Sequence, residues 1–179
     1  MDKYNLSIIG EPEEFGNIIF LDNYKFHNNT FFPNSYIEFV KKYGYGITMD
    51  QFYIYIPMDD YGDSWNIRTE EIKNTYYNDV QNNNVWFNLE PDGNIEIIKR
   101  LVPFSASKNG DYLFWDPEDE HNKEFKIYMT DFRTGFRKIG NSLYEIIEKM
   151  VNRKYYKEIL PFSKEPLPNI FKCLMKNNK

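Results

Sequence analysis

The sequence has little of several features that commonly reveal function. It contains one cysteine, Cys173, which excludes an intramolecular disulfide. Its two histidines, His27 and His121, are far apart and have no helical i, i+3 or i, i+4 partner, so the sequence gives little support for a zinc site. No apolar run approaches the roughly 20 residues that cross a bilayer, and no secretory signal pattern is visible. We therefore expect a cytoplasmic protein with no cofactor, no metal and no membrane insertion.

Signatures of catalysis are also missing. Ser105 and Ser107 lie outside any Gly-x-Ser-x-Gly pattern, and there is no glycine-rich phosphate loop or dinucleotide fingerprint. A sequence pI of about 5.2 disfavours direct binding of nucleic acid. These absences favour a binding protein over an enzyme.

The aromatic and apolar content is high enough for a globular core. Aromatic residues make up 18% of the 179 residues and hydrophobic residues 41%, which argues against disorder despite the many polar residues. The length fits one domain. The fifteen tyrosines and fifteen phenylalanines suit strands with one buried face.

Charge is divided unevenly along the chain. Residues 1–125 hold 10 Lys and Arg against 22 Asp and Glu, a net charge of −12, whereas residues 126–179 hold 12 against 5, a net charge of +7. Two interpretations remain open: the basic part packs beside the acidic part and neutralises it, or each part faces a separate partner.

Periodicity and turn signals predict an α+β domain. Asn34 and Gly44 bound a predicted helix over residues 33–43, Thr69 is a plausible cap for the next helix, and Ser142 caps a helix over residues 143–151 that continues or restarts over 155–160. Strands are predicted over residues 51–56, 95–102, 112–115 and 125–130. This order predicts a mainly antiparallel meander with N-terminal and C-terminal helices packed on one face.

The segment 101–124 joins a hairpin signal to a run of acidic residues. The turn dipeptide Asn109-Gly110 separates two apolar strands, and an acidic loop is expected after the second. Residues 111–124 contain one basic residue, Lys123, and six acidic residues, which gives a local net charge of −5. The acidic residues are Asp111, Asp116, Glu118, Asp119, Glu120 and Glu124. Its spacing does not match a calcium-binding loop, so we interpret it as a solvated contact surface.

A second acidic group lies in the loop after the strand 51–56. Asp59, Asp60 and Asp63 stand close to Tyr61 and Trp65, and aromatic residues beside carboxylates suit an interface. Core packing is the alternative for Trp65.

Three segments together resemble the SUKH family, the Smi/Knr-type cell-wall-assembly-regulator and toxin-immunity domains. They are the proline-started helix over residues 32–44, the hairpin carrying Val102-Pro103-Phe104 and Asn109-Gly110-Asp111, and Ile127-Tyr128 with residues 139–151. The chain departs from the usual pattern in the Asn-rich region 75–88 and in a basic, proline-rich tail. We therefore expect a SUKH-like domain over residues 1–152 and a partly helical basic extension over 153–179 that packs on the same domain.

The resemblance implies a non-enzymatic immunity protein that neutralises a cognate bacterial toxin, often a nuclease. An acidic surface agrees with this role, because it complements the cationic cleft in which a nuclease holds phosphates. The predicted contact residues are those of the two acidic groups: Asp59, Asp60, Asp63, Trp65, Asp111, Asp116, Glu118, Asp119 and Glu120. Two alternatives are a regulator or scaffold of cell-envelope assembly, and a hydrolase that pairs Asp111 with Asp116 or Glu118.

Overall fold

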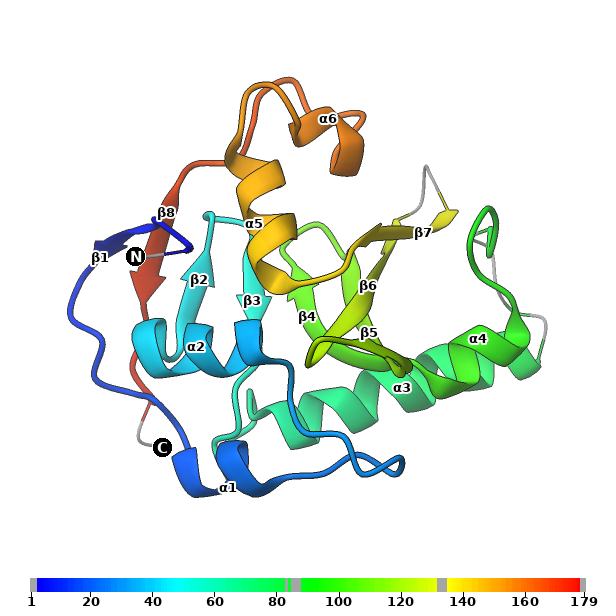
Figure 1. The fold of residues 1–179 in the computed structure, drawn as a ribbon, viewed down its shortest axis with the longest axis horizontal. Helices are drawn as coiled ribbons and strands as arrows, with labels where there is room; N and C mark the ends of the chain where they lie inside the picture. The colour runs from blue at the N-terminus through cyan, green and yellow to red at the C-terminus, as the bar shows by residue number, and fades with distance from the viewer. Residues whose placement is uncertain (1–2, 83, 85–87, 132–134, 178–179) are drawn as a thin grey trace.

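A computed structural model describes residues 3–82, 84, 88–131 and 135–177 of the chain. In this part, one twisted sheet lies between helices on both of its faces (Figure 1). The helices are α1 (Ile18–Asn23), α2 (Asn34–Tyr43), α3 (Trp65–Gln81), α4 (Ile95–Arg100), α5 (Leu143–Val151) and α6 (Tyr156–Ile159). The strands are β1 (Ser7–Ile9), β2 (Gly46–Thr48), β3 (Phe52–Ile54), β4 (Val102–Ser107), β5 (Tyr112–His121), β6 (Glu124–Asp131), β7 (Gly135–Gly140) and β8 (Ile170–Cys173). The predicted α+β class with a mainly antiparallel sheet is confirmed.

The sheet combines a sequential meander with strands from both ends of the chain. Its order is β1-β8-β2-β3-β4-β5-β6-β7, and every neighbouring pair is antiparallel except β1 and β8. Strand β8 is internal, between β1 and β2, and its Phe171 is fully buried. The basic extension therefore supplies a strand to the sheet itself.

Side chains on the two faces of the sheet enter two separate cores. Leu113 and Trp115 belong to the larger core, with α2 and α5, whereas the intervening Phe114 belongs to the smaller core, with α3 and α4. This alternation is expected because successive strand residues point to opposite faces. Helices α3 and α4 thus cover the face opposite to α2 and α5, an arrangement that the sequence did not indicate.

Helix α2 follows the sequence prediction closely. It runs from Asn34 to Tyr43, and Gly44 follows with a φ of 68°, a left-handed conformation that glycine adopts without strain. Asn34 does not cap the helix as predicted: it is the first helical residue, Pro33 precedes it, and no side chain caps the N-terminus. Tyr36, Phe39 and Val40 of this helix are fully buried, so the predicted apolar stripe faces the core.

The predicted strand over residues 95–102 is wrong, because Ile95–Arg100 forms helix α4. The Asn94 side chain accepts a hydrogen bond from the Ile97 N–H and caps this helix, and Lys99 pairs with Glu96 one turn earlier. These local signals outweigh the β-propensity of the three isoleucines. Thr69 is also not a cap: α3 begins at Trp65, and the Thr69 hydroxyl donates to the Pro103 carbonyl inside the core.

Candidate partner-binding face

The predicted acidic loop is the second half of a long strand. Residues 112–121 form β5, with a register shift against β6 between Asp116 and Glu120. Extra residues in one strand locally increase the twist and redirect side chains. The acidic residues here consequently face different environments.

Asp116 does not lie on the surface, contrary to the prediction. Its carboxylate is fully buried and accepts two hydrogen bonds from Arg100, from Nε at 3.0 Å and from Nη2 at 2.7 Å. The Glu118 N–H adds a third at 3.3 Å. A buried carboxylate needs such a partner, because desolvation strongly disfavours an isolated charge. Asp116 fastens α4 to β5 and is unavailable to a partner.

Trp65 is likewise an interior residue, so its predicted contact role is wrong and the alternative, core packing, is correct. Its ring packs edge to face against Phe32 at a centroid distance of 4.8 Å and against Tyr24 at 5.1 Å. Edge-to-face pairs of this kind add to the stabilisation that burial provides. Trp65 therefore anchors the start of α3 under the loop that precedes it.

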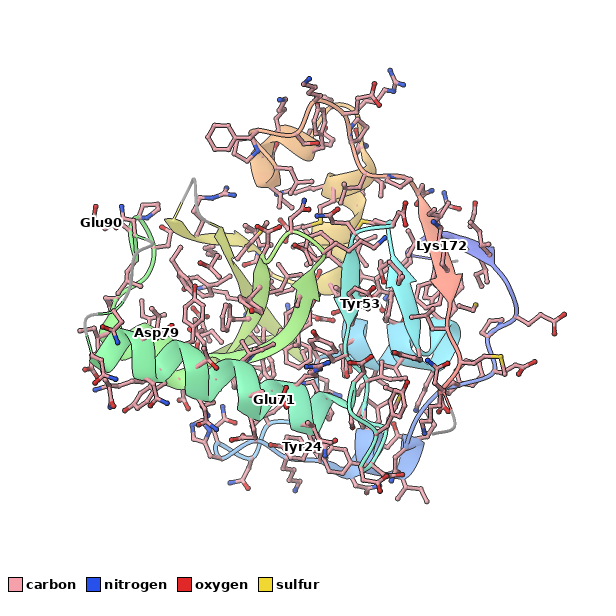
Figure 2. The ribbon with its side chains drawn as sticks, turned by 180° about the vertical axis from the view of Figure 1, so that it is seen from behind. Tyr24, Tyr53, Glu71, Asp79, Glu90 and Lys172 are labelled. Carbon is pink, nitrogen blue, oxygen red and sulfur yellow. The ribbon has the colours of Figure 1, made fainter. Side chains whose placement is uncertain are left out.

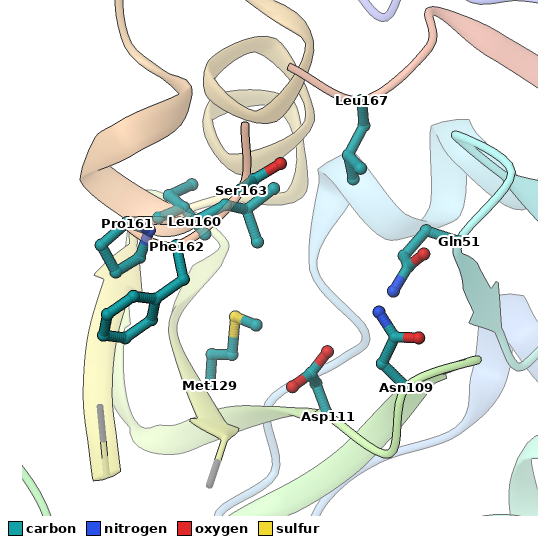
Figure 3. A pocket seen from close by; sticks show the side chains of 10 residues that line it. Gln51, Asn109, Asp111, Met129, Leu160, Pro161, Phe162, Ser163 and Leu167 are labelled. Atoms are coloured by element: carbon teal, nitrogen blue, oxygen red, sulfur yellow. The ribbon is translucent and has the colours of Figure 1, made fainter. Parts of the chain in front are cut away.

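Asp111 lies at the opposite end of β5 from Glu118, roughly 20 Å away at the rise of a strand. Its carboxylate accepts a hydrogen bond from the Ser107 hydroxyl and points into a pocket of about 480 Å³ beside Met129 and Asn109 (Figure 3). The structure therefore separates Asp111 from the carboxylates with which the hydrolase alternative would pair it.

Two of the predicted contact residues are neutralised by basic neighbours. Asp119 pairs with Lys126, and Asp63 pairs with Arg68 at 2.7 Å while accepting a hydrogen bond from the Tyr45 hydroxyl. Burial alone would raise the pKa of Asp63, but the bonds from Tyr45 and Arg68 and the charge of Arg68 outweigh it and lower the pKa. Both carboxylates keep a negative charge that their partners largely screen.

The remaining predicted acids are exposed and have no lysine or arginine within ion-pair distance among the described residues. Asp59 accepts a hydrogen bond from the Asn17 amide at 2.7 Å, Glu118 contacts His27, and Glu120 accepts from the Lys123 N–H. Asp60 is exposed beside Asp59. These four carboxylates are therefore the main sources of negative potential in the predicted set.

The two acidic groups meet at one segment, residues 18–31, which consists of α1 and the loop after it. Asn17 holds Asp59 at one end of this segment, and at the other end Asn28 donates to the Pro117 carbonyl and His27 contacts Glu118. Figure 1 shows α1, this loop and the start of α3 along the lower side of the molecule. The predicted acidic groups thus border a common surface.

Sequence reasoning missed the apolar part of this surface and one of its acids. Ile19 is 79% exposed and Phe31 is 48% exposed. The additional acid is Glu70 on α3, which lies close enough to Tyr24 of this segment to affect its pKa. Burial, the larger cause, and the negative charge of Glu70 both raise the pKa of Tyr24. The poor periodicity of residues 1–32 hid Ile19 and Phe31. We call this surface the α1 face: residues 18–31 with Asp59, Asp60, Glu70, Glu118 and Glu120.

A pocket of about 740 Å³ opens at the edge of the α1 face. Asp59, Asp60 and Tyr61 line one side, and Lys176 and Asn177 of the C-terminal segment line the other. Lys176 pairs with Glu14 at 3.3 Å, so its charge does not neutralise the two aspartates directly. A basic side chain that entered this pocket would meet two carboxylates.

The described residues contain no helix that is both long and apolar enough to span a membrane, and no cluster of three or more metal-binding side chains. His27 and His121 are both exposed, and Cys173 is half-buried in β8, where burial raises the pKa of its thiol.

Comparison with known proteins identifies the family. The family model SUKH_6, described as SMI1-KNR4 cell-wall, matches residues 21–147, a range that includes most of the α1 face and the meander β2–β7. Neither a curated protein nor a solved structure matches the chain. The SUKH family includes toxin-immunity and cell-wall-regulator members, and its members are generally not enzymes. The chain belongs to the SUKH family.

Proposed function

We propose that this protein is a non-enzymatic immunity protein that acts in the cytoplasm and neutralises a cognate toxin by one-to-one occlusion through the α1 face. The observation that carries the proposal is that five exposed carboxylates without a lysine or arginine partner border the segment 18–31, which carries exposed Ile19 and Phe31. Interfaces commonly have such an apolar centre within a charged and polar rim.

The charge of the α1 face favours a basic partner. Carboxylates that are not neutralised within their own protein attract a cationic surface over several ångströms, speed the encounter and reject acidic partners. A nuclease presents a cationic cleft to its substrate, so it is the toxin class that this face fits best. Occlusion of that cleft inhibits without any catalytic group in the immunity protein.

The first test is protection of cells. The product of the adjacent gene should be toxic when it is expressed alone, and co-expression of this protein should restore growth. The double variant Asp60→Lys/Glu118→Lys should lose protection, whereas Glu148→Lys/Glu165→Lys, which makes the same charge change at exposed sites on α5 and in the loop after α6, should keep it.

Failure of both the wild type and the variants to protect against that product would contradict the immunity role. Binding to proteins of envelope assembly in place of a toxin would favour the regulator or scaffold role instead.

A further inference from the structure

Residues 152–168 form a second charged surface, which we call the basic projection. It consists of α6 with the loops on either side and carries Arg153, Lys154, Lys157 and Lys164 against Glu158 and Glu165. Glu158 already pairs with Lys149 at 3.1 Å, outside the projection. Arg153, Lys154 and Lys164 are exposed and form no ion pair with any residue in the described ranges.

The basic projection lies at the opposite end of the molecule from the α1 face. α6 stands out at the top in Figures 1 and 2, which share their vertical axis, whereas α1 lies at the bottom, and nitrogen-ended side chains point outward from the top in Figure 2. Some basic residues after position 125 do pair with carboxylates of the acidic part, namely Lys126, Lys172 and Lys176. All of these lysines lie outside the projection. The positive charge of the projection is therefore available to attract a separate, negatively charged partner.

An aromatic side chain is held among these cations. The Lys157 ammonium donates to the carbonyls of Pro161 and Ser163, at 3.0 and 2.6 Å, and the Tyr156 hydroxyl donates to the Lys164 carbonyl at 3.0 Å. These bonds fix the loop that carries Phe162, whose side chain is 57% exposed. A large apolar ring is thus presented beside positive charge.

We propose that the basic projection docks on an anionic phospholipid surface, with Phe162 at the level of the headgroups. Aromatic rings prefer this interfacial region, and each nearby Lys or Arg adds about 1 kcal/mol of attraction to anionic lipid. One apolar anchor together with a basic patch supplies the two signals that peripheral binding requires.

A flat anionic surface fits better than a nucleic acid strand. Single strands are usually tracked by a positively charged groove, but the pocket beside Phe162 is lined by the Asp111 carboxylate and uncharged residues (Figure 3). The acidic α1 face does not oppose docking, because a domain of this length is about 40 Å across and charges are screened over about 8 Å at physiological salt.

The test measures co-sedimentation of the full chain with vesicles of phosphatidylcholine alone or with 40% phosphatidylserine. Binding should require phosphatidylserine, should weaken as salt is added, and should fall about fivefold for each charge removed in Lys154→Ala and Lys164→Ala. In Phe162→Trp, the added tryptophan fluorescence should shift to shorter wavelength on the anionic vesicles, since the ring enters a less polar layer.

The matched control is Lys73→Ala/Lys99→Ala, which removes two charges outside both the projection and the α1 face and should bind like the wild type. Equal losses in the control and in the double variant Lys154→Ala/Lys164→Ala would overturn the assignment to the projection. Absence of binding to phosphatidylserine vesicles, or tighter binding to a 30-nucleotide oligothymidine than to vesicles, would overturn the lipid proposal. Protection against the toxin does not enter this readout, so the two proposals fail independently.

Discussion

The Arg100 guanidinium donates two hydrogen bonds to the buried Asp116 carboxylate, at 3.0 and 2.7 Å, and so joins the last turn of α4 to the middle of β5. This pair explains why a carboxylate that the sequence places in an acidic run contributes nothing to the surface. The Asp116 side chain neutralises Arg100 and is not available to a binding partner.

Removing Arg100 should destabilise the fold. Arg100→Met leaves the Asp116 carboxylate buried without its partner. Loss of one member of a fully buried pair costs about 3 kcal/mol or more, and because the Arg100 side chain is 42% exposed we expect a loss of about 2 kcal/mol here. Urea unfolding of Arg100→Met should therefore show a clearly lower free energy of unfolding than the wild type. The adjacent exposed pair provides a control, since Lys99→Met should change stability by less than about 0.5 kcal/mol. Equal effects at the two positions would refute the assigned role of Asp116.

The C-terminal strand should be needed for stability. Phe171 is fully buried where β8 joins β1 to β2, and truncation of a buried phenylalanine to alanine costs about 3–5 kcal/mol. Phe171→Ala should thus lower the thermal midpoint strongly, whereas Met175→Ala, at a residue 68% exposed, should leave it nearly unchanged. A Phe171→Ala variant as stable as the wild type would contradict the burial of Phe171 in the core.

Stability should depend on pH through Glu124. Burial raises the pKa of this carboxyl, although it accepts hydrogen bonds from the Ser35 N–H at 2.8 Å and from the Ser35 hydroxyl. A raised pKa in the folded state means that the protonated carboxyl is favoured there. The stability that protonated Glu124 contributes is therefore fully present below about pH 4.5, and it is lost as pH rises through the pKa of the folded state.

Glu124→Gln removes that titration and keeps the ability to bond with Ser35. Its free energy of unfolding relative to the wild type should therefore increase between about pH 4 and pH 7. Parallel stability curves for the two proteins across this range would contradict the shift.

Local signals in the sequence predicted part of this fold, and long-range contacts decided the rest. The helix from Asn34 to Tyr43 ends at the predicted glycine, Gly44, and the hairpin turn at Asn109-Gly110 carries its own turn residues, and both elements are present. The strand Ile170–Cys173 has no such marker, because its identity depends on partners more than 100 residues away in sequence. The second core, under α3 and α4, likewise has no local marker in the sequence, because it forms only when these helices pack against the sheet.

The candidate site shows the same division. Composition indicated two acidic groups, but which of their carboxylates are exposed depends on ion pairs with residues such as Arg100 and Arg68 that follow no sequence pattern. Ile19 and Phe31 contribute to the α1 face because their side chains are exposed, and their exposure is evident only in the folded chain.

We propose that the unneutralised carboxylates on the α1 face capture a basic toxin. The most direct test is the association rate of the purified protein with its cognate toxin, measured by stopped flow from 50 to 500 mM salt. For Asp60→Lys/Glu118→Lys, we expect an association rate at least about tenfold lower at low salt and a flatter salt dependence. An association rate equal to that of the wild type at every salt concentration would contradict it.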